Sequence, residues 1–96
     1  MQLGIIGLGR MGLNIAIRLA AAGHDCVVFD RHAANVANAV AGGARAADDV
    51  AAMAAMLPTP RIVWLMIPAA AVDDAIDGLV PNLAAGDIVV DGGNSN

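Results

Sequence analysis

The sequence predicts one domain of the α/β class, a doubly wound parallel sheet with strand order 3-2-1-4-5 over residues 1–96. Short runs rich in β-branched residues alternate with longer alanine-rich segments, which is typical of a parallel sheet with crossover helices. Hydrophobic residues make up 58% of the chain, enough for one core but with a modest buried fraction at this size. Right-handed crossovers then lead to the stated strand order.

Five short segments have the character of strands. They are Leu3–Ile6, Cys26–Phe29, a very short segment near Ala44–Ala46, Arg61–Ile67 and Ile88–Val90. The fourth is an apolar run, as expected of a strand that is buried on both faces, and Pro68 ends it.

Four helices are expected between these strands. The first spans Met11–Ala22, with Met11, Ile15 and Leu19 on one face, and Gly23 stops it. The second runs from about Ala33 to the pair Gly42 and Gly43, and the third from an N-cap at Asp48 to Leu57, before Pro58 and Pro60. The fourth covers Val72–Val80, with Asp73 and Asp74 near its positive amino end.

Composition excludes several classes of function. A net charge of -4 and scattered arginines argue against a nucleic acid partner. The chain has no Lys, Glu or Tyr, so it supplies no lysine base or glutamate acid. Cys26 is expected to be a buried apolar residue of a reduced cytoplasmic protein, and neither a targeting segment, a membrane span nor a metal site is expected.

The strongest local motif is "IIGLGRMG", in which Gly7, Gly9 and Gly12 have the G-x-G-x-x-G spacing between a strand and a helix. Gly7 permits a tight turn, Gly9 lets backbone N–H groups approach a pyrophosphate, and Gly12 lets the helix pack closely on the strand. The positive amino end of the helix faces the phosphates. The motif therefore predicts a Rossmann-like domain that binds a dinucleotide.

An acidic residue follows this motif at the end of the second predicted strand. Asp30 comes eighteen residues after Gly12, where a carboxylate accepts hydrogen bonds from the adenosine ribose and repels a 2′-phosphate. This favours NAD over NADP. Arg31 is expected to stack on the adenine or to face solvent, although a guanidinium there could also pair with a 2′-phosphate. His32 lies in the same loop, either near the adenosine or exposed without a role.

Four stretches together resemble the amino-terminal domain of decarboxylating 6-phosphogluconate dehydrogenases: "GIIGLGRMG", "VVFDR", "PRIVWLMIPA" and "GDIVVDGGNSN". The last is the most specific, because related β-hydroxyacid dehydrogenases have a different turn there. Asp30 resembles the NAD-preferring branch, since many members carry Asn at that position and use NADP. The resemblance also implies one or more further strands in the family's domain.

The resemblance implies a set of site residues. The pyrophosphate would lie on the turn formed by Gly7, Leu8, Gly9, Arg10, Met11 and Gly12, the adenosine ribose beside Asp30, Arg31 and His32, and the cofactor's edge beside Ile67, Pro68 and Ala69. Asn94 would contact both the nicotinamide and the substrate. In the family, 6-phosphogluconate is oxidised at C3, loses carbon dioxide and gives ribulose 5-phosphate, as part of gluconate use and the pentose phosphate pathway.

The family's catalytic Lys and Glu would lie beyond Asn96, so no catalytic residue is expected within this chain, which alone would be inactive. The full-length enzyme would be a homo-oligomer with a helical substrate domain. Two alternatives remain open. One is another β-hydroxyacid dehydrogenase, such as one acting on 3-hydroxyisobutyrate, and the other is a stand-alone module that senses dinucleotides.

Overall fold

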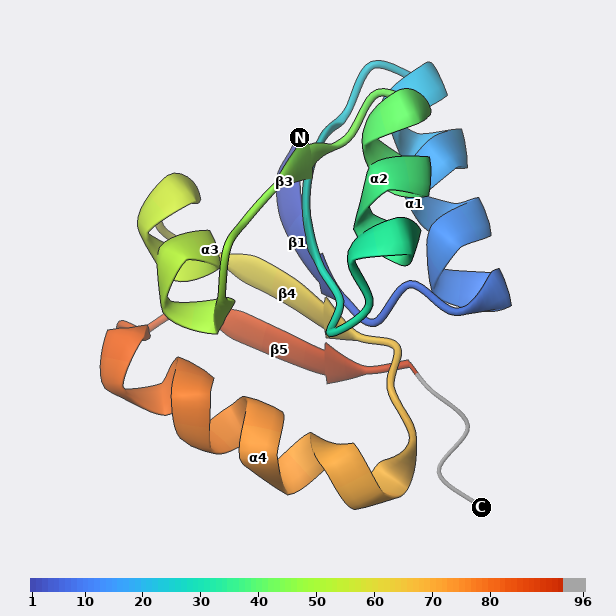
Figure 1. Ribbon diagram of the computed structural model, residues 1–96. Coiled ribbons are helices and arrows are strands. Elements are labelled where there is room, and N and C mark those ends of the chain that lie inside the picture. Colours follow the sequence, from blue (N-terminus) through green and yellow to red (C-terminus); the bar gives the residue numbers. More distant parts are fainter. Residues whose placement is uncertain (93–96) are drawn as a thin grey trace.

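The computed structural model describes residues 1–92 and contains one five-stranded parallel sheet, in the order β3-β2-β1-β4-β5 (Figure 1). The sequence predicted this order and this sheet type. Adjacent strands pair in parallel, with Gly4 opposite both Val27 of β2 and Val63 of β4. The first strand therefore lies in the middle of the sheet, and the chain proceeds outward from it in each direction.

The elements agree with the predicted ones in number and kind, apart from an added turn of 3-10 helix. The strands are β1 (Gln2–Ile6), β2 (Asp25–Phe29), β3 (Arg45–Ala46), β4 (Ile62–Leu65) and β5 (Ile88–Asp91). The helices are α1 (Arg10–Ala21), α2 (Ala33–Ala41), α3 (Val50–Met56) and α4 (Ala69–Leu79), and the 3-10 helix η1 spans Val80–Asn82.

Helices cover both faces of the sheet and form two cores (Figure 1). On the first face, α1 and α2 pack on a cluster that includes Ile5 and Val28, and Cys26 is fully buried there. On the second face, α3 and α4 pack on a cluster that includes Val63 and Leu65. This arrangement is the doubly wound architecture.

The face that α1 turns toward the sheet differs from the prediction. Its buried residues are Gly12 and Ala16, whereas Met11 is 62% exposed. Ile15 and Leu19 pack on the first core, as partly buried residues. Small residues face the sheet because the helix approaches the turn after β1 too closely to admit a large side chain.

Two predicted helix starts were wrong. The N-cap of α3 is Asp49, not Asp48: the Asp49 side chain accepts a hydrogen bond from the Ala52 N–H at 2.7 Å. Helix α4 begins at Ala69 rather than Val72, directly after Pro68, so no acidic residue lies in its first turn. Asp73 and Asp74 therefore lie beyond the part of the helix where the dipole stabilises an anion best.

Strand β4 is shorter than predicted, and only one of its faces is completely buried. Val63 and Leu65 have no exposed surface, whereas Ile62 and Trp64 on the other face are partly exposed. Helices α1 and α2 lie over β1, β2 and β3, so they leave this face of β4 incompletely covered (Figure 1).

A partly buried ion pair joins the amino ends of β4 and β5. The Arg61 guanidinium lies 3.0 Å from the Asp87 carboxylate, whose side chain is 1% exposed. The same carboxylate accepts hydrogen bonds from the backbone N–H groups of Arg61 at 2.6 Å and Ala84 at 2.8 Å. Arg61 also donates from Nε to the Ala54 carbonyl at 2.7 Å, which connects the end of α3 to this edge.

Candidate dinucleotide site

The glycine-rich turn connects β1 to α1 at the carboxyl edge of the sheet, and two of its glycines are required by packing. Gly7 has a φ of 98°, and a Cβ on it would lie 2.5 Å from the Met66 carbonyl oxygen. A Cβ on Gly12 would collide with the Gly7 carbonyl oxygen. The predicted roles of a tight turn at Gly7 and close packing at Gly12 agree with this geometry.

Gly9 has a different environment from the other two glycines. It is the N-cap residue of α1, its φ is -63°, and a Cβ added to it would meet no atom within 4 Å. Because the N-cap residue is a glycine, it has no side chain to cap the helix, and within residues 1–92 the first N–H groups of α1 remain for an anionic ligand. Open space next to an uncapped helix end fits a pyrophosphate.

Asp30, at the end of β2, is bonded to this turn. Its carboxylate accepts hydrogen bonds from the backbone N–H of Leu8 at 2.6 Å and of His32 at 2.8 Å, and from the Asn35 side-chain amide at 3.4 Å. Asp30 therefore joins three segments: the glycine-rich turn, its own loop and helix α2. About four lone-pair positions exist on a carboxylate, so at least one is left for a ligand hydroxyl.

The Asp30 carboxylate stays ionised at neutral pH. Partial burial acts to raise its pKa, but the hydrogen bonds from His32 and Leu8, with a further one from Asn35, hold the pKa below its usual range. Within residues 1–92 no arginine forms a hydrogen bond or ion pair with this carboxylate, and the His32 side chain also acts to lower its pKa. A negative charge therefore stands where the sequence predicted the adenosine ribose.

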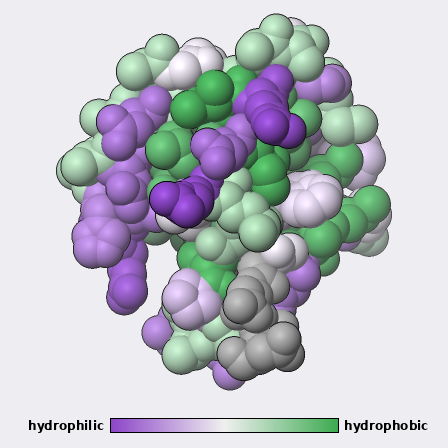
Figure 2. All heavy atoms as spheres, turned by 90° about the vertical axis from the view of Figure 1, so that its right-hand side faces the viewer, coloured by the Kyte–Doolittle hydropathy of each residue, from purple (hydrophilic) through white to green (hydrophobic). Residues whose placement is uncertain are grey.

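A cavity of about 510 Å³ opens beside the turn and Asp30. Its walls come from the end of β1 and the glycine-rich turn, the end of β2 and the loop after it, the starts of α2 and α3, the loop after β4, and α4. The lining residues are Ile6, Gly7, Gly9, Phe29, Asp30, Arg31, His32, Asn35, Val50, Met66, Ile67, Pro68, Ala71, Asp74 and Ala75. Figure 2 looks onto this edge of the molecule, where hydrophobic surface is bordered by hydrophilic patches.

The structure brings together seven of the predicted site residues in this cavity: Gly7, Gly9, Asp30, Arg31, His32, Ile67 and Pro68. Five others lie outside its lining. Leu8 has its side chain in the core and its N–H bonded to Asp30, Gly12 is buried beneath the turn, and Arg10, Met11 and Ala69 are exposed. Asn94 lies outside the described residues.

Asn35 and Asp74 line the cavity but were missed from the sequence. Asn35 lies in the first turns of α2, five residues after Asp30, to which it donates a hydrogen bond. Asp74 follows Ala71 by three residues, so the two lie on one face of α4. A helix predicted from Ala69 onward would have included Ala71, and the three-residue spacing would then have placed Asp74 on the same face as Ala71.

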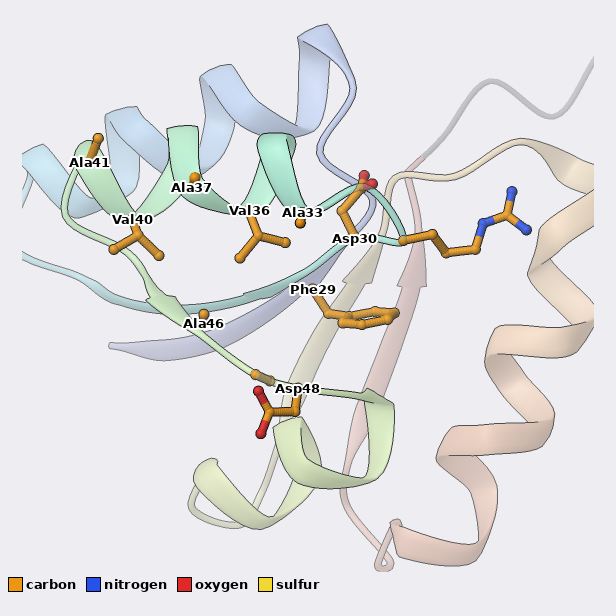
Figure 3. Close-up of a pocket in the computed structure, with 11 residues that line it drawn as sticks. Phe29, Asp30, Ala33, Val36, Ala37, Val40, Ala41, Ala46 and Asp48 are labelled. Atoms are coloured by element: carbon orange, nitrogen blue, oxygen red, sulfur yellow. The ribbon is translucent and has the colours of Figure 1, made fainter.

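A second, shallower groove of about 700 Å³ continues from this cavity along α2 (Figure 3). Figure 3 shows Val36 and Val40 pointing from α2 toward β3, while the Phe29 ring and the Asp30 carboxylate point to opposite sides of their backbone. The two hollows share Phe29, Asp30 and Arg31. The lining of the groove is largely apolar, and its charged residues are Asp30, Arg31 and Asp48.

The end of β5 reaches the same edge of the sheet. The Gly92 N–H donates to the Leu65 carbonyl at 3.0 Å, and a Cβ on Gly92 would lie 2.9 Å from the Met66 sulfur. A glycine therefore allows the chain to pass close to the loop after β4.

Among residues 1–92, no helix is long and apolar enough to cross a membrane, and no group of three or more side chains that could hold a metal ion is found.

Comparison with known proteins extends these observations. Residues 2–96 match the family model described as the NAD binding domain of 6-phosphogluconate dehydrogenase. The chain is 50% identical to an NAD(+)-dependent, decarboxylating 6-phosphogluconate dehydrogenase of Haloferax volcanii, over 100% of the chain and 32% of that protein. The chain thus spans about a third of this relative's length.

Two solved structures agree in fold. A Plasmodium falciparum 6-phosphogluconate dehydrogenase matches with a TM-score of 0.88 and 28% identity, over 100% of this chain and 22% of that one. A Mycobacterium tuberculosis 3-hydroxyisobutyrate dehydrogenase matches with a TM-score of 0.87 at 20% identity, over 96% of this chain and 31% of that one. The second likeness is one of fold alone.

Proposed function

Since the chain belongs to the family of NAD-binding domains of 6-phosphogluconate dehydrogenases, we propose that it binds NAD in preference to NADP, as the cofactor domain of such an enzyme. The main support for the preference is the Asp30 carboxylate, which is ionised and lines the cavity beside the glycine-rich turn. A 2′-phosphate placed next to it would be repelled, whereas ribose hydroxyls can donate to it.

The cofactor would lie across the carboxyl edge of the sheet. Its pyrophosphate would face Gly9 and the uncapped end of α1, and its adenosine would lie between the loop after β2 and α4. The nicotinamide end would pass Ile67 and Pro68 toward the end of β5. When bound, NAD supplies the acceptor for a hydride, and the residues of this chain bind and orient it.

The substrate of the whole protein is proposed to be 6-phosphogluconate, oxidised and decarboxylated in the cytoplasm. The support is the "DGGNSN" stretch at the end of β5, whose described part approaches the cavity through Gly92 and Met66. Asn94 is proposed as a contact of both nicotinamide and substrate. Because the chain has no Lys or Glu, acid and base catalysis by those residues would need groups outside it.

Activity of the enzyme that contains this chain tests the choice of substrate. With NAD present, oxidation of 6-phosphogluconate and release of carbon dioxide are expected, and 3-hydroxyisobutyrate should be a poor substrate. Oxidation of 3-hydroxyisobutyrate alone would assign the domain to the other branch of dehydrogenases.

Cofactor binding by the chain itself is tested with Gly9→Ala. The added methyl group meets no protein atom, so the free energy of unfolding should change by less than about 0.5 kcal/mol. The same methyl group would crowd the pyrophosphate, and calorimetric titration should show the affinity for both NAD and NADP reduced about tenfold or more.

Gly78→Ala is the matched control, since it adds the same methyl group on α4 with ordinary contacts of 3.7 Å and lies outside the cavity lining. It should bind both cofactors as the wild type does. If Gly9→Ala also bound them normally, the turn would have no role in holding phosphates, and the proposal would fail.

A further inference from the structure

The part of the cavity wall formed by α4 contains a second carboxylate, in addition to that of Asp30. On α4, Ala71, Asp74 and Ala75 all line the cavity and have the spacing of one helix face. Val72 and Ile76 pack on the second core, as Ala75 also does, and this packing sets the rotation of the helix about its axis. Because its two neighbours on this face are alanines, no large side chain of α4 stands between Asp74 and the cavity.

Asp74 differs from Asp30 in how its charge is used within the protein. Asp30 accepts hydrogen bonds from Leu8, His32 and Asn35. Across residues 1–92, the Asp74 carboxylate takes part in no hydrogen bond or ion pair, and its residue is exposed. Its charge is therefore fully available to whatever enters the cavity.

The charges around this end of the cavity are unequal. Asp30 and Asp74 supply carboxylates, and Arg31 supplies the guanidinium among the residues that line it. With histidine counted as neutral, the charged side chains of this lining are two carboxylates and the Arg31 guanidinium, so a 2′-phosphate brought here would meet a lining of net negative charge. The hydroxyls of an unphosphorylated ribose and the amino group of adenine are hydrogen-bond donors, which a carboxylate favours.

We propose that Asp74, from α4, is a specificity-determining residue that acts with Asp30 in the same cavity to exclude a dinucleotide with a phosphate on its adenosine ribose. This inference rests on the proposed binding of NAD. It assigns part of the cofactor preference to α4, so that the preference does not depend on the loop after β2 alone.

The test is calorimetric titration of NAD and NADP into the wild-type chain and into Asp74→Asn, at about 0.15 M salt. Removing one charge from the cavity wall should raise the affinity for NADP about threefold or more, and should change the affinity for NAD less than about twofold. Asp73→Asn is the matched control, because Asp73 is exposed on the same helix, carries the same charge and does not line the cavity.

Equal ratios of NADP to NAD affinity in Asp74→Asn and Asp73→Asn would overturn the inference, since the effect would then come from overall charge. An equal change in both affinities would overturn it as well, because Asp74 would then contact the shared part of the cofactor. A wild-type chain that bound neither cofactor would refute the proposed function together with this inference. If the wild-type chain bound NAD and the ratio of NADP to NAD affinity were the same in Asp74→Asn as in the wild type, the inference alone would be refuted.

Discussion

Asp30 and Asp87 lie at opposite edges of the sheet and bind distant backbone in the same manner. Asp30, after β2, accepts from the Leu8 N–H at 2.6 Å, and Asp87, before β5, accepts from the Arg61 N–H at 2.6 Å. Each bond joins segments more than twenty residues apart in the chain. Both carboxylates therefore hold a loop against the edge of the sheet.

The two sites differ in the partner of the charge. Asp87 faces the Arg61 guanidinium at 3.0 Å, and its side chain is almost completely buried. Asp30 receives only N–H donors and borders the cavity. One carboxylate is neutralised inside the fold and stabilises it, while the other keeps a charge that a ligand can meet. The comparison indicates that a carboxylate at a strand end can serve stability or recognition, depending on whether a cation is supplied.

Replacing Asp87 should have the largest effect on stability. Asp87→Ala leaves the Arg61 guanidinium and the N–H groups of Arg61 and Ala84 without their acceptor at a partly buried position. Loss of one member of this partly buried pair, together with two backbone hydrogen bonds, is destabilising, so the melting temperature should fall by about 5 to 10 °C. Circular dichroism during heating measures it.

Asp77→Ala is the matched control for this change, since Asp77 is exposed on α4. It should shift the melting temperature by no more than about 3 °C. Similar shifts in the two variants would mean that the Arg61 pair adds nothing to the fold.

The cofactor preference should respond to Asp30→Asn. Removing the charge takes away the repulsion of a 2′-phosphate, so the ratio of NADP to NAD affinity should rise about fivefold or more. Both affinities should also fall. The two carboxylate oxygens accept from Leu8 and His32, and an amide cannot accept on both sides, so the glycine-rich turn loses part of its support.

Titration of both cofactors into wild type and Asp30→Asn separates the two effects. An unchanged ratio would refute the role of Asp30 in discrimination, and a changed ratio with unchanged NAD affinity would show that the bond to Leu8 does not support the turn.

The smallest effect is expected from a change of pH. Near neutral pH both carboxylates are ionised, so stability should depend little on pH there. Hydrogen bonds from Ala84 and Arg61 lower the pKa of Asp87, and those from His32 and Leu8 outweigh burial to lower that of Asp30. In the unfolded chain these groups titrate near about 3.9. The unfolded state then binds more protons below that pH, so stability should be constant from about pH 7 to 5 and fall as the pH drops below about 4.

Urea unfolding between about pH 3 and 7 measures this dependence. The fall in midpoint at low pH should be shallower in Asp87→Asn than in Asp77→Asn, because one of the groups that links stability to pH is absent. Identical profiles would show that Asp87 has the same pKa in the folded and unfolded chain.

Sequence reasoning succeeded where the information was local. The alternation of β-branched and alanine-rich segments predicted the strand order, and the spacing of Gly7, Gly9 and Gly12 predicted the turn after β1. The errors also had local causes. Two adjacent aspartates can each cap α3, and only the backbone geometry selects Asp49. The alanines after Pro68 have no amphipathic pattern, so the start of α4 was placed too late.

Sequence by itself determined the kinds of element, their order and the turn, because strand and helix propensity and glycine spacing depend on neighbours in the chain. Tertiary structure decided which further residues, Asn35 and Asp74 among them, join the predicted ones around the cavity. The bond between Asp30 and Leu8 spans 22 positions, and Asp74 reaches the cavity because α4 packs Val72 and Ile76 on the sheet. Such contacts depend on how elements pack in space, since helix rotation is set by burial of an apolar face and not by local propensity.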